Sequence, residues 1–238
     1  MKSSTCIIFS ALAFALFAGV YGATCWFELG LWAIPVWVAM IAAIPLSSLL
    51  HELGHMLFGA MCGIKTKPHF SLLGSSSCAL MPNKEDKLKA RVIATVYGGC
   101  AVNVVIGLTV GTLISFNIAP VWLSFLIPAN IYLILLNAFP VHFPSGKADG
   151  LVVDEIVKDK DEGKVLLAVL TVQAQILNGK PIEEVDESLL FDLPQIREDD
   201  QSFIALTELR YEYMKAKGND EEAQKYKERF EQLKQEYM

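Results

Sequence analysis

Two histidines and a glutamate, His51, Glu52 and His55, interrupt a long apolar stretch of the chain. On a helix, side chains four residues apart project from one face, so the two imidazoles can reach a single ion. Neutral imidazole is a good zinc ligand, and the carboxylate of Glu52 can accept a proton from a metal-bound water. This H-E-x-x-H arrangement is typical of zinc hydrolases, and it predicts a Zn2+ site with Glu52 as the catalytic base.

The apolar surroundings of this motif favour a functional role over a structural one. Ionisable side chains inside a membrane span are costly and are functional candidates by default. A core hydrogen bond can satisfy one buried histidine, but the three ionisable groups of this motif need several partners. We therefore expect the cluster to bind a metal ion.

A catalytic zinc site needs a third protein ligand and one open position. Two residues beyond the motif are candidates by type and location. Asp149 stands just before Gly150, where the backbone can turn sharply, and His142 stands at the end of the last apolar segment. The residue pattern by itself leaves these two candidates comparable.

The elements that must position these residues are membrane helices. A spanning helix needs about 20 mostly apolar residues. Four segments meet this requirement: Cys6–Thr24, Leu31–Cys62, Val92–Ile118 and Val121–Phe143. The first segment also has the basic start and apolar middle of a signal sequence. We expect an all-α polytopic membrane protein with about four transmembrane helices.

The composition divides the chain into two halves. The sequence is 53 % hydrophobic and 19 % charged. Residues 1–146 carry seven basic and four acidic side chains, whereas residues 147–238 carry thirteen and twenty-two. This distribution excludes an ordinary soluble enzyme, and the lack of a basic face excludes a nucleic-acid-binding protein. We expect a first transmembrane helix or signal anchor (1–30), a membrane core with the motif (31–150) and an acidic cytoplasmic helical domain (151–238).

The loop between the second and third segments, Gly63–Ala90, is rich in lysine and decides the orientation. Short basic loops stay in the cytoplasm, so we expect this loop and both termini to be cytoplasmic. Within the loop, the apolar stretches Phe70–Leu73 and Cys78–Met81 flank a Gly-Ser turn and predict a short β-hairpin. A hairpin alone is marginal in water, so we expect it to lie against the membrane domain, with an edge open to an extended peptide.

The acidic region has no spanning run and is predicted to form soluble helices. The pattern indicates a helix around Val165–Val172 that ends near Gly179, then a helical pair over Ser202–Lys217 and from Asn219 onward. The last helix carries an apolar seam at spacings of 3 and 4, formed by Ala223, Tyr226, Phe230, Leu233 and Tyr237. This seam either packs on its own chain or binds a protein partner or a second copy.

Three stretches of the chain, in this order, resemble the motifs of one known family. They are His51–His55 inside a span, the glycine-rich run Gly98–Asn103 in the next span, and Asn137-Ala-Phe-Pro140 followed by Asp149-Gly150. Together they cover about residues 31–150 and resemble the site-2 protease family of intramembrane zinc metalloproteases.

This resemblance implies roles for residues that periodicity leaves open. Asp149 would be the third zinc ligand, and the Gly63–Ala90 hairpin would receive the substrate strand. The implied substrate-binding group is Asn137, Pro140, Asn103, Gly98 and Gly99. Close helix packing for the glycines and an interhelical hydrogen bond for the asparagines are the structural alternatives.

Two departures from the family pattern bear on the metal site. Cys100 stands where the family usually has proline. The segment Val141–Ala148, which contains Lys147, also makes the distance from Pro140 to the Asp-Gly motif longer than the commonest spacing. The longer spacing keeps His142 as a substitute for Asp149.

The resemblance implies a zinc metalloendopeptidase that hydrolyses peptide bonds in or near transmembrane segments of membrane proteins or peptide precursors. Its partners would be that substrate and the lipid bilayer, with no nucleic acid, and its place would be the bacterial plasma membrane. The alternatives are a catalytically inactive scaffold of the same fold and an ion or proton transporter that uses the His/Glu/Asp cluster as a relay. The intact Glu52 argues against the scaffold, and the lack of a visible inverted repeat argues against the transporter.

Overall fold

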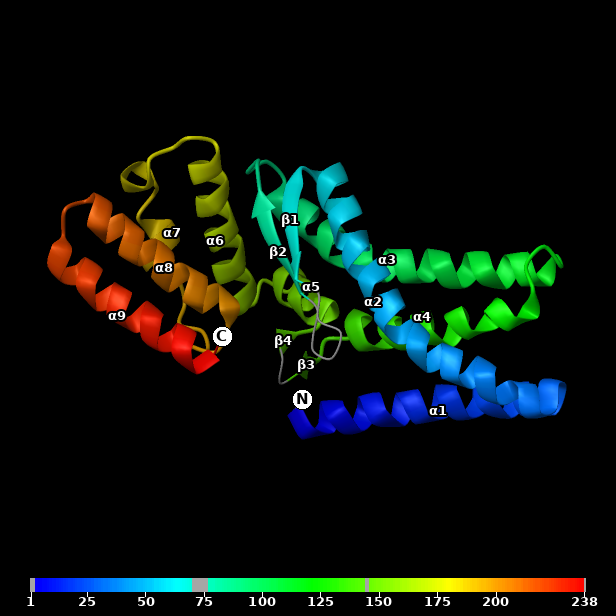
Figure 1. Ribbon diagram of the computed structural model, residues 1–238. Coiled ribbons are helices and arrows are strands. Elements are labelled where there is room, and N and C mark those ends of the chain that lie inside the picture. The colour runs from blue at the N-terminus through cyan, green and yellow to red at the C-terminus, as the bar shows by residue number, and fades with distance from the viewer. Residues whose placement is uncertain (1–2, 70–76, 144–145, 238) are drawn as a thin grey trace. The chain divides into compact units, whose positions relative to one another are not determined.

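The structure is a computed structural model that describes residues 3–69, 77–143 and 146–237 (Figure 1). It is mostly helical, at 76 %. The chain forms two compact units, and each is described by itself. The first unit comprises the residues up to 59, 66–79 and 94–152, and the second comprises 60–65, 80–93 and the residues from 153 onward.

The first unit begins with two long helices, α1 (Ser3–Leu29) and α2 (Ala33–Cys62), joined by a 3-10 turn at Gly30–Trp32. Gly30 has a φ of +57°, a left-handed conformation that glycine adopts without strain, and the chain turns back there (Figure 1). The indole Nε1 of Trp37 in α2 donates a hydrogen bond of 3.1 Å to the carbonyl of Ala18 in α1. The two helices therefore form a helical hairpin.

Two further helices contribute to the first unit. They are α3 (Leu88–Ser115), from residue 94 onward, and α4 (Leu126–Ala138), which follows a 3-10 turn at Val121–Phe125. Helix α1 packs against α4, where the rings of Phe14 and Tyr132 meet edge to face with centroids 5.3 Å apart. Side chains from four helices are thus available to form one site.

Three helical stretches among the described residues are long and apolar enough to cross a membrane: Phe14–Cys62, Leu88–Ser115 and Val121–Ala138. Large apolar side chains on them face outward, and Phe27, for example, is 87 % exposed. Exposed apolar surface on this scale marks a region that contacts lipid or protein, so the finding is consistent with membrane association. The first stretch contains both α1 and α2, and the number of spans stays a prediction.

A small β-sheet pairs β1 (Ile64–His69) with β2 (Ser77–Pro82). The strand predicted around Cys78–Met81 is confirmed, and the one predicted at Phe70–Leu73 lies outside the described residues. The strand that pairs with β2 starts earlier, at Ile64, which is buried. A hairpin therefore exists in the lysine-rich loop, and its contact with a membrane stays a prediction.

A second hairpin, which the sequence pattern did not predict, lies between Pro140 and Asp149. It pairs β3 (His142–Phe143) with β4 (Gly146–Lys147) in antiparallel register. Helix α5 (Asp149–Val157) follows it directly and starts at the candidate third ligand.

The second unit is built on helices with a common apolar core. Its elements are α6 (Asp161–Leu177), the 3-10 turn Ile182–Glu184, α7 (Ser188–Phe191), α8 (Gln201–Ala216) and α9 (Asp220–Tyr237). The predicted helix over Val165–Val172 and the predicted helical pair are confirmed. Asn219 caps α9, because its side-chain oxygen accepts a hydrogen bond of 3.3 Å from the backbone N–H of Glu222.

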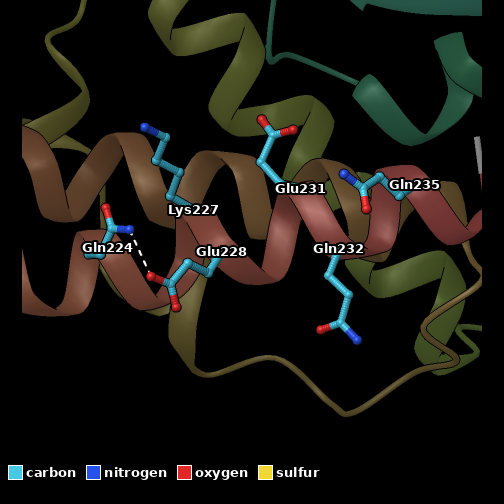
Figure 2. Close-up of a pocket in the computed structure, with 6 residues that line it drawn as sticks. All are labelled: Gln224, Lys227, Glu228, Glu231, Gln232 and Gln235. Atoms are coloured by element: carbon cyan, nitrogen blue, oxygen red, sulfur yellow. Dashed lines mark hydrogen bonds between the residues drawn. The ribbon is translucent and has the colours of Figure 1, made fainter.

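The apolar seam of α9 packs on its own chain. Ala223 and Leu233 are 4 % and 0 % exposed, and α9 lies alongside α8. The opposite face of α9 is polar and charged, with Gln224, Lys227, Glu228, Glu231, Gln232 and Gln235 around a shallow hollow (Figure 2). A partner or a second copy on the C-terminal helices stays a prediction.

Candidate metal centre

Helix α2 brings the three motif side chains into the interior of the first unit. His51, Glu52 and His55 are 4 %, 5 % and 5 % exposed. The two imidazole rings lie edge to face with centroids 4.7 Å apart, as the four-residue spacing predicts. His51, Glu52 and His55 each offer a ligand atom within 4.8 Å of the other two, so this group could hold a metal ion.

Asp149, the first residue of α5, lies beside both imidazoles. Its Oδ2 is 3.0 Å from Nε2 of His51 and 3.4 Å from Nε2 of His55. A carboxylate in the first turn of a helix is stabilised by the N-terminal end of the helix dipole. The next residue, Gly150, packs its backbone on the end of α4, where a Cβ would lie 2.2 Å from the carbonyl oxygen of Ala138. The glycine therefore lets α5 start close enough for Asp149 to reach the histidines.

Hydrogen bonds on the far side of each ring set which nitrogen faces Asp149. Nδ1 of His55 lies 3.0 Å from the carbonyl oxygen of Thr95, which can only accept, so this Nδ1 carries the proton. Nδ1 of His51 lies 2.6 Å from Oδ1 of Asn103. In the neutral rings, both Nε2 lone pairs then point at a carboxylate oxygen. Three electron pairs that converge on one place need a positive charge between them, which a shared proton or a bound metal ion supplies.

The spacing of these donor atoms suits a tetrahedral metal ion. Bonds of about 2.0–2.2 Å from zinc to imidazole and carboxylate place adjacent donors about 3.3–3.6 Å apart. The two distances to Asp149 Oδ2, 3.0 and 3.4 Å, are close to this value. The outer hydrogen bonds from each Nδ1 are also those that metal-ligating histidines usually make. The residues present therefore fit a divalent metal whose identity the geometry leaves open.

One carboxylate oxygen of Glu52 stands out in this interior. Its Oε2 is buried and has no hydrogen-bond partner among the described residues. A buried polar atom without a partner costs about 1–3 kcal/mol, so such an atom usually has a function. Because the same side chain adjoins both imidazoles, Glu52 is placed to accept a proton from a water at the metal position.

Glycines allow α2 and α3 to meet at the site. A Cβ on Gly98 would lie 2.7 Å from the carbonyl oxygen of Gly54, and a Cβ on Gly99 would lie 2.6 Å from Nε2 of His51. The ring of His51 thus rests directly on the backbone of α3. This contact supports the packing role of Gly98 and Gly99, and their contact with substrate stays a prediction.

The remaining predicted substrate-binding residues lie at two places. Asn103 is fully buried behind His51. Asn137 donates a hydrogen bond of 3.0 Å to the carbonyl of Leu133 in its own helix, and Pro140 is an exposed residue after the end of α4. Asn137 and Pro140 flank Ala138 and Phe139, which Gly150 contacts. In the described part of the chain, neither is hydrogen-bonded to a proposed metal ligand.

The structure distinguishes the two candidates for the third ligand by their position. His142 sits in β3, opposite Lys147, and neither group of metal-ligand spacing found among the described residues includes it. The second such group consists of His51, Cys100 and Asp149. Cys100 is buried, so the thiol that replaces the family's proline lies next to the centre.

Strand β2 also runs near the centre. Burial raises the pKa of the Cys78 thiol to about 11, the charge of Glu52 raises it further, and a hydrogen bond from Thr66 in β1 lowers it. The charge of Asp149 also raises the pKa of this thiol, so β2 lies within electrostatic range of the centre.

Sequence reasoning missed the residues that hold the histidines. Ser47, Asn130 and the carbonyl of Thr95 all belong to the hydrogen-bonded surroundings of the two rings. Asn130 could have been found, because a polar side chain in an apolar span is a functional candidate by default.

No family model, no curated protein and no solved structure matches this chain. The resemblance to site-2 proteases consequently stays an expectation from the three sequence motifs.

Proposed function

We propose that this chain is an intramembrane zinc metalloendopeptidase of the site-2 protease type. One observation carries the proposal: two buried imidazoles present Nε2 to a single oxygen of Asp149, beside a buried Glu52 oxygen that has no hydrogen-bond partner in the described part of the chain. This is the donor set of a catalytic zinc with a base next to it.

The chain's own residues have distinct roles in peptide hydrolysis. His51, His55 and Asp149 would hold the metal, which when bound would polarise the scissile carbonyl and acidify a water. Glu52 would take the proton of the attacking water and return it to the leaving amine as the peptide bond breaks. Burial of the centre strengthens both effects, because charges interact more strongly away from bulk water.

The proposed membrane arrangement has four spans. A continuous helix over the 49 residues of Phe14–Cys62 would be about 74 Å long, more than twice the ~30 Å hydrocarbon core. The break at Gly30 divides this stretch into two helices of spanning length, α1 and α2. With Leu88–Ser115 and Val121–Ala138 the proposed number is four. The basic side chains of the lysine-rich loop support a cytoplasmic location of both termini, and the proposed membrane is the plasma membrane of a bacterium.

The proposed substrate is a membrane-spanning or membrane-adjacent segment of another protein or of a peptide precursor. A substrate helix must unwind before its carbonyls can be attacked, since they are hydrogen-bonded within the helix. Among the described strands, β1 and β2 pair only with each other, so their outer edges are open to an extended chain. Strand β2 lies within electrostatic range of Glu52.

Zinc content tests the metal centre directly. The protein is purified in mild detergent, and zinc per chain is measured for the wild type, Asp149→Ala, His142→Ala and Glu52→Gln. We expect about one zinc in the wild type, His142→Ala and Glu52→Gln, and none in Asp149→Ala. Loss in His142→Ala alone would move the third ligand to the hairpin. No zinc in any variant after metal supplementation would overturn the proposal and leave the scaffold and the transporter.

Hydrolysis is tested separately from metal binding. Membrane-spanning peptides with a fluorophore and quencher are reconstituted with the protein in bicelles. Glu52→Gln should retain zinc and lose cleavage by about 10²–10⁴-fold, because general-base catalysis contributes this much. Equal cleavage by the wild type and Glu52→Gln would show that the activity does not arise from this site.

A further inference from the structure

A chain of buried amides connects helix α4 to the first histidine of the motif. Asn130 in α4 accepts a hydrogen bond of 2.7 Å at Oδ1 from Nδ2 of Asn103 in α3. Oδ1 of Asn103 lies 2.6 Å from Nδ1 of His51 in α2. Ser47, Asn103 and Asn130 are all 0 % exposed, so the protein itself must satisfy every polar atom of this chain.

The acceptors at the far end fix the direction of every bond. Nδ2 of Asn130 donates to the carbonyl of Leu126 at 2.8 Å and to Oγ of Ser47 at 3.3 Å. Nδ2 of Asn103 donates to Oδ1 of Asn130 and, at 3.4 Å, to the carbonyl of Ser47. Because all four amide protons are used in this way, only an oxygen of Asn103 is left to face His51.

The opposite orientation of Asn103 is unfavourable for an electrostatic reason. With its amide turned over, Oδ1 of Asn103 would face Oδ1 of Asn130 and the carbonyl of Ser47, and three acceptors would meet without a proton. The amide NH2 would face Nδ1 of His51 and favour the tautomer with its proton on Nε2. That tautomer has no lone pair at the nitrogen that lies 3.0 Å from Asp149.

We infer that Asn130 is a positioning residue of the metal centre. By holding the amide of Asn103 in one orientation, it keeps the proton of His51 on Nδ1 and the Nε2 lone pair free for the metal. Among the described residues, Asn130 is hydrogen-bonded to Asn103, Ser47 and Leu126 and to no proposed ligand, so it acts on His51 through Asn103. The metal part of this inference rests on the proposed function, whereas the tautomer of His51 does not depend on it.

A double-mutant cycle separates positioning from packing. Metal affinity is measured by competition with a chromophoric chelator for the wild type, Asn130→Leu, Asn103→Asp and the double variant. Asn130→Leu should weaken zinc binding by about 10–100-fold, the usual loss when an outer partner of a ligating histidine is removed. With Asn103→Asp, either carboxylate oxygen can accept from His51, so Asn130→Leu should then cost less than about threefold.

Ser115→Ala is the matched control. Ser115 lies on α3, the helix that carries Asn103, and its hydroxyl donates a hydrogen bond of 2.9 Å to the carbonyl of Gly111 in its own helix, away from the amide chain. Its zinc affinity should equal that of the wild type. An equal loss from Asn130→Leu with and without Asn103→Asp would assign Asn130 a packing role and overturn the inference, as would no loss at all.

The tautomer is read in the Asp149→Ala background, because in the metal-free protein the carboxylate of Asp149, 3.0 Å from Nε2 of His51, competes with Asn103 for the proton of the ring. Nitrogen-15 spectra of histidine-labelled protein are recorded at alkaline pH, with His51 identified by its absence in His51→Gln. Asp149→Ala, alone or with Ser115→Ala, should show the proton of His51 on Nδ1, and Asp149→Ala with Asn130→Leu should show both tautomers. A proton on Nε2 in Asp149→Ala, or an unchanged spectrum when Asn130→Leu is added, would overturn the inference.

Discussion

Replacing Gly99 by alanine tests whether the backbone of α3 holds the imidazole of His51 in place. A Cβ at this position would lie 2.6 Å from Cε1 and Nε2 of His51 and 2.7 Å from Cδ2. Carbon atoms in favourable contact are about 3.5–4.0 Å apart, so the ring and the helix must separate by about 1 Å. A metal site tolerates about 0.2 Å in a ligand distance, so this separation takes Nε2 away from the ion.

The size of the effect follows from the cost of overpacking. An extra methyl group in a packed interior costs about 1–3 kcal/mol. If the cost falls on the metal-bound arrangement, where the ring cannot move, zinc affinity decreases about 5- to 150-fold at 1.4 kcal/mol for each factor of ten. The metal-free protein relaxes more easily, because the ring of His51 is then held only by its hydrogen-bonded neighbours.

Gly107→Ala provides the control on the same helix. A Cβ at Gly107 meets nothing within 4 Å, so this variant should bind zinc normally and be neutral or about 0.5–1 kcal/mol more stable. Zinc affinity is measured by chelator competition and stability by thermal unfolding in detergent. If Gly99→Ala binds zinc as tightly as Gly107→Ala, α3 does not position His51, and the reasoning from the glycine contact is refuted.

Three further predictions concern other parts of the chain. Glu52 raises the pKa of the Cys78 thiol and Thr66 lowers it, so the pH midpoint of Cys78 alkylation should lie near 11. Measured by peptide mass spectrometry, this midpoint should fall in Glu52→Gln and rise in Thr66→Val. An unchanged midpoint in Glu52→Gln would show that the charge of Glu52 does not act on β2. Leu233 is fully buried, so Leu233→Ala should lower the free energy of unfolding of the C-terminal helices by about 2–5 kcal/mol in denaturant unfolding. Tyr237 is 43 % exposed, so Tyr237→Ala should lower it by less than about 0.5 kcal/mol. Similar losses in both variants would contradict the packing of α9. Zinc at about 100 times its dissociation constant should stabilise the wild type by about 2.7 kcal/mol and leave His55→Ala unchanged; equal stabilisation of both would place the metal elsewhere.

The ligand-bearing motif was predictable because polar groups in an apolar helix are conspicuous. His51 and His55 follow a spacing that the α-helix converts directly into a shared face, and the structure places them so. The helices of the acidic region were predictable for a similar reason, since Asn219 and Gly218 mark a cap and a stop around an amphipathic pattern.

The surroundings of the motif could not be predicted in the same way. Hydrogen bonds between Asn130, Asn103 and Ser47 join three helices, and their partners depend on how those helices pack, which local spacing does not contain. The first strand of the hairpin begins at Ile64, in a stretch whose alternating lysines gave no apolar run to recognise. Tertiary contacts therefore decide these features, and sequence periodicity decides the motif.

The long connection between Pro140 and Asp149 contains a hairpin whose ends lie close together. Strands β3 and β4 pair in antiparallel register, and the backbone N–H of Ala148 donates to the carbonyl of Val141 at 3.0 Å. Val141 and Ala148, both buried, are thereby brought together as if they were neighbours. Asp149 consequently lies close in space to the end of α4, where Gly150 contacts Ala138. The longer spacing, which kept His142 as a candidate ligand, therefore forms a hairpin that ends next to Asp149, and His142 is one of the paired residues of that hairpin.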